Sequence, residues 1–281
     1  MGGETIRIAH MASMARSGET LMQRAFIGHP AVHVVHDVHP TNDEHETRLF
    51  QLLRVWPRPE LPRWQLEQHL APGQVAAGTQ VLLIKQGVFA MRSPFNGFAL
   101  VRNPYASFCS LWHYDARLAG VKAEQALNER NWRLRRLPRL VAWMDAIEPG
   151  MLPALLAEAE PARQFLMLWQ VRMQQLVAQC RTVVLYEDFV NDPQPALRSA
   201  CAAIGVPFDG AMLKAHEKFE PGQIGHGGID LGAAIHPAPA WRADAQVDIT
   251  PFRAAVRDGP IAGYRQFYEQ AGSINRESVA A

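Results

Sequence analysis

The chain has 281 residues, and its 28 Lys and Arg against 27 Asp and Glu give a formal net charge of +1. Apolar residues make up 48% and charged residues 20%, a composition that can bury a core and excludes disorder as the main state. The near-zero charge argues against a protein that binds nucleic acid through its overall charge. It leaves open a small anionic ligand that is bound by a few well-placed cations.

Three cysteines, Cys109, Cys180 and Cys201, are widely spaced and form no CxxC pair. Neither a disulfide framework nor a cysteine-rich zinc site is therefore expected, and a reducing cytoplasm is the simplest location. We find no apolar run long enough for a signal peptide, and none that approaches the roughly 18 residues of a membrane span. We expect a soluble protein and leave its oligomeric state open, a homodimer included.

The first part of the chain predicts two strand and helix units. Residues 5–11 alternate and are rich in β-formers, and apolar residues over 19–29 have the spacing of one helix face. Residues 31–38 predict a second strand. Two further helices are expected at 42–54 and 63–70.

Three more strands are predicted, of which 79–85 is nearly all apolar until its last residue, as in a strand buried on both faces of a parallel sheet. The other two are expected at 97–102 and 181–186. A long helical region separates these two, with an Arg-rich helix over 122–147 and an amphipathic helix over 161–180. The later predicted helices cover 193–204, 208–219 and 259–271.

Strands that alternate with helices predict an α/β fold of three layers, with a central, mostly parallel sheet between helices. We expect one domain over residues 1–281, with helical insertions at about 39–78 and 111–180. Residues 221–240 are rich in Gly and Pro, and we expect them to lack regular structure. A loop of this length inside a domain is usually functional or disordered.

The first motif, ARSGETL, lies where the first predicted strand meets the first helix. A helix N-terminus offers unpaired N–H groups and the positive end of the helix dipole, and both bind anions. Gly18 lets an anion approach the backbone, Arg16 adds a cation and Thr20 adds a hydroxyl. With one glycine and no lysine, this is not the GxxxxGK loop of nucleoside triphosphatases. Taken alone, it also fits an ordinary strand-to-helix turn.

The second motif begins where the strand GFALVR ends at Arg102. Asn103 is a favourable N-cap and Pro104 suits the first helical position, which places Ser110 about two turns into a helix. Ligands of parallel sheets bind beyond the carboxyl ends of the strands. We therefore expect Arg102 and Ser110 to form a second anion site, although a turn followed by a surface serine is the simpler alternative.

Together these segments resemble the PAPS-dependent sulfotransferases. ARSGETL resembles their 5′-phosphosulfate loop, where K/R-S-G-T-T is usual, and VRNPYASFCS resembles their 3′-phosphate motif. LIK at 83–85 resembles the strand that ends in a lysine before that motif. Residues 183–209, from VVLYEDF to GVPFD, resemble a late segment of the family. The four segments occur in the family's order.

The resemblance implies a P-loop α/β fold and transfer of the sulfuryl group of PAPS (3′-phosphoadenosine-5′-phosphosulfate) to a hydroxyl or amine of a small molecule or glycan. The transfer would be in line, without a metal, and would leave adenosine-3′,5′-bisphosphate. Arg102 and Ser110 would hold the 3′-phosphate, and Tyr186 would contact the adenine. Lys85 would face the sulfuryl group, and Arg16 would act with it in catalysis. The residues implied for the phosphosulfate loop are Arg16, Ser17, Gly18, Glu19, Thr20 and Leu21.

Two residues depart from the family pattern. Glu19 stands where the family has Thr, and a dry, unpaired carboxylate there would repel a bound phosphosulfate. The simpler interpretation is that Glu19 is solvated or paired with an arginine and turned away; the alternative is that it acts as a base or organises a cation. After Lys85 the chain reads Gln86 and Gly87, so the catalytic His in the KTH sequence of cytosolic relatives is absent.

For the catalytic base we favour His36 and Asp37, at the end of the second predicted strand, because bacterial and carbohydrate-directed relatives often place an acidic base in a comparable region. The other candidates are His39, Glu44, His45 and His113. Histidines at 33, 36 and 39 alternate between the faces of a strand and would not converge on an ion. We therefore expect no metal site.

Two other functions stay open from the sequence. A nucleotide-binding protein that has lost catalysis and binds a partner would explain the missing His and the Glu at position 19. A small-molecule kinase on the same scaffold is opposed by the missing lysine of the triphosphate loop. The Arg-rich helix more simply forms a solvated face than a surface for an acidic partner. Residues 221–240, followed by Arg242, are a candidate for the loop that closes over PAPS in this family.

Overall fold

A computed structural model describes residues 4–35, 58–68, 75–87, 96–121, 124–144, 150–225, 229–236, 244 and 246–257. The predicted helices at 42–54 and 259–271 lie outside these residues. So do the candidate residues His36, Asp37, His39, Glu44, His45 and Arg242.

The centre of the molecule is a six-stranded sheet in which five strands run parallel in the order β2-β4-β1-β5-β6. These strands are β1 (Thr5–Ser13), β2 (Val32–Val35), β4 (Val81–Gly87), β5 (Gly97–Val101) and β6 (Val183–Leu185). The sixth, β3 (Glu60–Pro62), pairs antiparallel with the start of β1. The predicted α/β fold with a mostly parallel sheet is confirmed.

Helices cover both faces of this sheet, because its strands are apolar on both sides. Ala9 and Met11 of β1 pack on one face with Phe26 of α1 (Glu19–Ile27) and Leu197 of α11 (Pro193–Ala203). The same face includes Met212 of η2 (Gly210–Lys218), a 3₁₀ helix. On the opposite face, Ile6 and Ile8 pack with Leu66 of α3 (Arg63–Glu67).

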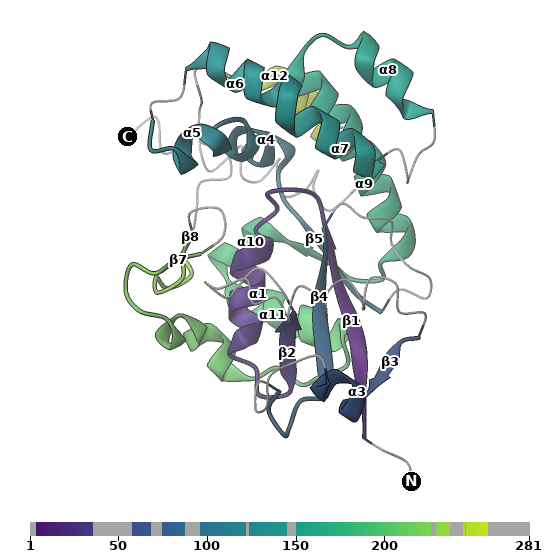
Figure 1. Ribbon diagram of the computed structural model, residues 1–281, viewed down its shortest axis with the longest axis vertical. Helices are drawn as coiled ribbons and strands as arrows, with labels where there is room; N and C mark the ends of the chain where they lie inside the picture. The colour runs from purple at the N-terminus through teal and green to yellow at the C-terminus, as the bar shows by residue number, and fades with distance from the viewer. Residues whose placement is uncertain are drawn as a thin grey trace.

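A group of helices between β5 and β6 lies beyond the end of the sheet where β1 leads into α1 (Figure 1). Phe108 is central to its core, with ring centroids 5.4 Å from those of Trp112, Trp132 and Phe165. The helices are α4 (Pro104–Trp112), α5 (Tyr114–Leu118), α6 (Gln125–Asn131), η1 (Trp132–Arg136), α7 (Leu137–Met144), α8 (Met151–Ala157) and α9 (Pro161–Gln179), joined from the C-terminal side by α12 (Thr250–Arg257).

Several elements differ from the sequence expectation. The predicted helix over 122–147 is divided by a π-helical turn at η1. Residues 221–240, expected to be irregular, contain a pair of two-residue strands, β7 (Ile224–Gly225) and β8 (Ile229–Asp230), which are too short to leave a period-two pattern. A short helix, α10 (Tyr186–Asn191), follows β6 at once, where the sequence predicted only the strand.

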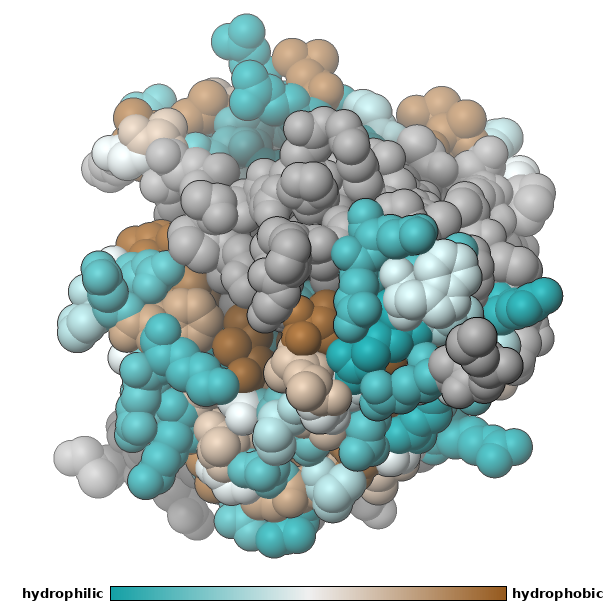
Figure 2. Space-filling model, turned by 60° about the horizontal axis from the view of Figure 1, so that its bottom comes forward, coloured by the Kyte–Doolittle hydropathy of each residue, from teal (hydrophilic) through white to brown (hydrophobic). Residues whose placement is uncertain are grey.

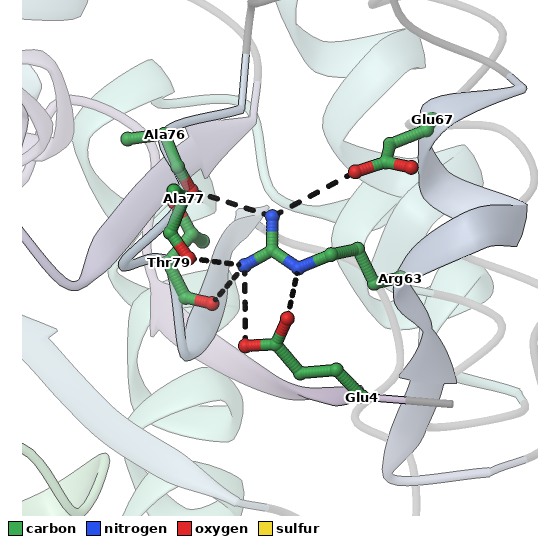
Figure 3. Close-up of polar contacts among 6 residues, drawn as sticks. All are labelled: Glu4, Arg63, Glu67, Ala76, Ala77 and Thr79. Atoms are coloured by element: carbon green, nitrogen blue, oxygen red, sulfur yellow. Dashed lines mark hydrogen bonds and ion pairs between the residues drawn. The ribbon is translucent and has the colours of Figure 1, made fainter. Parts of the chain in front are cut away.

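Arg63 joins three segments at the end of the molecule away from this group of helices (Figure 3). Its Nε lies 2.7 Å from Glu4 Oε2, and its Nη2 donates to the carbonyl oxygens of Ala77 and Thr79, each at 2.9 Å. Oε1 of Glu67, one helical turn further along α3, lies 3.9 Å from Nη1 of Arg63. The N-terminal residues, α3 and the turn before β4 are therefore held by one guanidinium.

In the coloured part of the face seen in Figure 2, hydrophilic residues are widespread and hydrophobic residues occupy smaller areas between them. Large exposed apolar side chains such as Trp64 and Ile224 belong to separate elements, which is normal for a protein surface. In the Arg-rich helix, Arg133 and Arg135 are exposed. Among the described residues, no helix is both long and apolar enough to cross a bilayer.

Candidate functional site

The loop between β1 and α1 has an unusual backbone. Arg16 has a φ of 67° and Gly18 a φ of 93°, and Arg16 is the one non-glycine residue with positive φ in the described part of the chain. A side-chain-bearing residue in this region is strained, and such strain clusters at functional sites. Turns of this kind direct successive N–H groups into a concavity that binds anions.

Donors at the start of α1 are left open by the helix itself. The first helical hydrogen bond runs from the N–H of Met22 to the carbonyl of Gly18 at 3.1 Å, and the N-cap supplies no side-chain acceptor. The N–H groups of Glu19, Thr20 and Leu21 therefore have no carbonyl within the helix to bond. This end of α1 has the donor pattern and dipole that an anion requires.

Ser17, a residue predicted for the phosphosulfate loop, is buried and does not line the cavity described below. Its side chain is 1% exposed, and its Oγ has no hydrogen-bond partner among the described residues. Leaving a buried hydroxyl unpaired costs about 1–3 kcal/mol.

Glu19 is buried, which excludes the solvated arrangement that the sequence left open beside one paired with an arginine. It is 7% exposed, and its Oε1 accepts a hydrogen bond from Ser13 Oγ at 3.0 Å. The carbonyl of Ser13 in turn accepts from Nε of Arg172, at 3.0 Å. Burial lowers the pKa of that arginine to about 10, so it stays charged at neutral pH. A fixed cation thus lies two hydrogen bonds from the buried carboxylate.

The second motif forms the expected strand end and helix start. The side chain of Asn103 accepts hydrogen bonds from the N–H groups of Tyr105 and Ala106, at 2.8 and 3.2 Å, so Asn103 caps α4 as predicted. Its own N–H donates to Oε1 of the buried Glu187, at 2.9 Å. This bond joins the end of β5 to α10 and fixes the position of Arg102 between them.

The two motifs meet in space. Nη1 of Arg102 donates to the carbonyl of Arg16 at 3.1 Å, and Nε of Arg16 donates to Ser110 Oγ at 3.1 Å. The guanidinium of Arg102 lies over the ring of Tyr186, 4.4 Å from its centroid. Two cations, a hydroxyl and an aromatic ring are therefore gathered at one rim of the sheet.

These groups line a cavity of about 320 Å³, a size typical of small-molecule sites. The sequence-predicted residues in its lining are Arg16, Gly18, Glu19, Thr20, Leu21, Arg102, Ser110 and Tyr186. The rest of the lining was not predicted by residue, and consists of Arg24, Ile229, Asp230, Ala233, Ala234, Ile235 and His236. The Gly and Pro content of residues 221–240 was the sequence signal that this segment could belong to a site. Nothing in the sequence around Arg24 indicated that it would line the cavity.

The helices beyond the sheet reach the site through Tyr114. The guanidinium of Arg16 lies 4.8 Å from the Tyr114 ring centroid, and that of Arg136 lies 4.5 Å from it. Arg136 is also paired with Asp115 through both of its carboxylate oxygens. The inserted helices therefore help to hold the loop arginine.

Other predicted residues lie elsewhere. Lys85 is half-buried on β4, in register with Met11, and does not belong to the cavity lining. His113 is bonded to Asp244 through Nε2, and its Nδ1 lies 3.0 Å from the Asn128 amide, so both ring nitrogens are engaged away from the cavity. Within the described ranges, no three or more His, Cys, Asp or Glu side chains are grouped as metal ligands.

Comparison with known proteins gives distant likenesses. No family model and no curated protein matches the chain. Among solved structures, the sulfotransferase domain from the curacin biosynthetic pathway is 16% identical over 95% of this chain and 98% of that chain, with a TM-score of 0.41. The sulfotransferase domain from the Synechococcus PCC 7002 olefin synthase is also 16% identical, over 75% and 78%, with a TM-score of 0.39. Such scores carry no weight for function, which rests on the residues of this chain.

Proposed function

We propose that this chain is a sulfotransferase that binds PAPS in the cavity and transfers its sulfuryl group to a hydroxyl or amine of a small molecule or glycan. One observation carries the proposal. Two motifs that are far apart in the sequence, the loop at Gly18 and the pair Arg102 and Ser110, line a single cavity together with Tyr186.

The donors of the cavity suit a nucleotide with two separate anionic groups. Backbone N–H groups at the start of α1 and the hydroxyl of Thr20, which lines the cavity, would take the 5′-phosphosulfate. Arg102 and Ser110 would take the 3′-phosphate, since a guanidinium and a hydroxyl form charge-assisted hydrogen bonds with it. The ring of Tyr186 offers an apolar face beside these groups, as an adenine requires.

When bound, PAPS supplies an activated sulfuryl group. The chain's contribution is a set of fixed donors at the sites where charge increases on the leaving oxygen, and such donors need no reorganisation during transfer. We assign this role to the N–H groups of the loop and to Arg16. Lys85 is proposed to join them from the neighbouring strand, and the base that receives the acceptor's proton is proposed in the region of His36 and Asp37.

Calorimetric titration tests the nucleotide site directly. We expect adenosine-3′,5′-bisphosphate to bind in the presence of EDTA, and Arg102→Ala to weaken binding by about 1–3 kcal/mol, the range for a lost hydrogen bond to a charged group. Arg198→Ala is the matched control, because Arg198 lies over the ring of Phe208 and not in the cavity. Tight binding of ATP with magnesium, and none of the bisphosphate, would overturn the proposal.

Transfer is tested with PAPS that carries a labelled sulfuryl group and a panel of alcohols, phenols, amines and glycans. We expect label to move to at least one class of acceptor. Bisphosphate binding without transfer to any of them would instead identify a nucleotide-binding protein that has lost catalysis.

A further inference from the structure

Arg24 is a buried cation on α1 that, among the described residues, donates hydrogen bonds to one short segment. The residue is 1% exposed. Its Nη1 has two N–H groups, which are shared among three backbone carbonyls, those of Asp230 at 3.2 Å, Leu231 at 3.0 Å and Ala233 at 2.5 Å. These acceptors belong to residues 229–236, which we call the cavity wall because most of them line the cavity.

The cavity wall has little local structure to hold it. Its strand β8 pairs with β7 over two residues only, and an isolated hairpin of this kind is at best marginally stable in water. The N–H of Leu231 donates to the carbonyl of Gln223 at 2.7 Å, and that of Gly232 to Asp230 Oδ1 at 2.9 Å. The Leu231 side chain is buried in the core beside the sheet, and Ile229 and Ile235 pack partly against the same core. Arg24 adds to this apolar packing a set of hydrogen bonds from α1 to the wall's backbone.

We propose that Arg24 is a positioning residue that fixes the cavity wall against α1, so that the nucleotide site is complete before the ligand arrives. The statement that the completed site binds a nucleotide rests on the proposed function. The fixation itself is a property of the free protein. Pre-ordering the wall spares the ligand the entropy of immobilising it, which increases affinity without a new contact.

The bonds of Arg24 to the wall all start from one nitrogen, Nη1, at the end of a long side chain. The guanidinium stays protonated in proteins. Because its acceptors are backbone carbonyls, these bonds make no use of the side chains of the wall. Loss of the guanidinium would leave three carbonyls without this partner, and the wall would keep only its apolar packing on the side of α1.

Arg24 also lines the cavity, so a purely electrostatic role must be separated from positioning. Arg24→Met removes both the charge and the donors, whereas Arg24→Lys keeps the charge and loses the guanidinium fork. Arg7→Met is the matched control, because Arg7 also donates to two carbonyls, of Ile204 at 3.2 Å and Gly205 at 2.9 Å, at a place outside the cavity lining.

The deciding measurement is amide hydrogen exchange at Leu231 and Gly232 in the ligand-free protein, with the thermal midpoint as the check on folding. We expect Arg24→Met to accelerate exchange there at least about tenfold, the scale of one lost charge-assisted hydrogen bond, and Arg24→Lys to accelerate it less. Arg7→Met should leave it unchanged. If Arg24→Met does not fold, the exchange is measured in Arg24→Lys instead. An exchange rate equal to that of the wild-type protein, in whichever variant folds, overturns the inference.

Titration with adenosine-3′,5′-bisphosphate then links the wall to the site. We expect Kd to rise about tenfold in Arg24→Met, in parallel with the exchange. A raised Kd with wild-type exchange would show that Arg24 acts by charge alone and overturn the positioning role. If the wild-type protein does not bind the bisphosphate, the proposed function fails, and the exchange in the free protein still decides whether Arg24 fixes the wall.

Discussion

The ring of Tyr186 lies so close to the backbone of Gly18 that a Cβ at Gly18 would come within 2.2 Å of Cδ2 of the ring. Gly18 is the N-cap of α1, and Tyr186 is the first residue of α10. The contact therefore joins, at the cavity, the loop that follows the central strand β1 to the helix that follows the edge strand β6. The φ of 93° at Gly18 excludes most side chains independently of this contact.

We predict that Gly18→Ala abolishes measurable binding of adenosine-3′,5′-bisphosphate. The added methyl must displace the Tyr186 ring or the loop, and either movement shifts Arg102, which lies on the same ring. The strain of the positive φ adds a stability loss of about 1 kcal/mol. Calorimetry gives the affinity and thermal unfolding gives the stability.

Gly150→Ala is the matched control for this variant. Gly150 is also a helix N-cap, has a φ of 87°, and has open space where its Cβ would lie. It should therefore lose stability from strain alone and keep wild-type affinity for the bisphosphate. Equal binding by the two variants would show that the contact between Tyr186 and Gly18 does not shape the site.

Glu19→Gln is predicted to tighten binding of the bisphosphate. The carboxylate is buried beside the cavity and repels an anion there, so its neutralisation should lower Kd by roughly fivefold, the effect of about 1 kcal/mol. Glu124→Gln makes the same change of charge at an exposed helix start and should leave Kd unchanged. Weaker binding or lost turnover in Glu19→Gln would instead assign Glu19 the role of a base or of a cation organiser.

The protein is predicted to lose stability as the pH rises above about 9. Burial raises the pKa of Cys109 and of Cys201 to about 12, against an ordinary value of 9.0. Between pH 9 and 12 the unfolded chain therefore loses these protons while the folded chain keeps them, and the free energy of unfolding falls with pH. Thermal midpoints at pH 8 and 10 should differ by several degrees, on the order expected from the linkage.

Cys201→Ala separates this effect from other titrations. The variant starts less stable because it loses a buried sulfur, but its midpoint should fall less between pH 8 and 10 than that of the wild-type protein. The same fall in both proteins would exclude Cys201 as a source of the pH dependence.

The sequence predicted the parts of the site that depend on local patterns. Apolar runs ending in a cation or a glycine-containing turn mark where parallel strands end, and this correctly placed Gly18 and Arg102 at one rim of the sheet. The N-cap at Asn103 followed from the side-chain chemistry of a single position. The mostly parallel sheet followed from the alternation of strands and helices.

The features that the sequence did not predict depend on long-range contacts. Arg24 is one polar residue on an amphipathic helix, and its role is visible only when residues 229–236 fold back on α1. The burial of Glu19 likewise requires Ser13 and Arg172, which come from β1 and α9. A pattern of neighbouring residues carries no information on partners at such separations.

Two substitutions of Tyr186 distinguish the contribution of its ring to nucleotide binding from that of its hydroxyl. The ring supports the guanidinium of Arg102 at 4.4 Å and packs on Gly18, and both contacts are made by the aromatic face or edge. Tyr186→Phe should therefore bind adenosine-3′,5′-bisphosphate as the wild-type protein does. Tyr186→Leu should bind it about 2- to 30-fold more weakly, the range of a cation–π contact of about 0.5–2 kcal/mol. A loss of affinity in Tyr186→Phe equal to that in Tyr186→Leu would show that the hydroxyl, rather than the ring, is what the site requires.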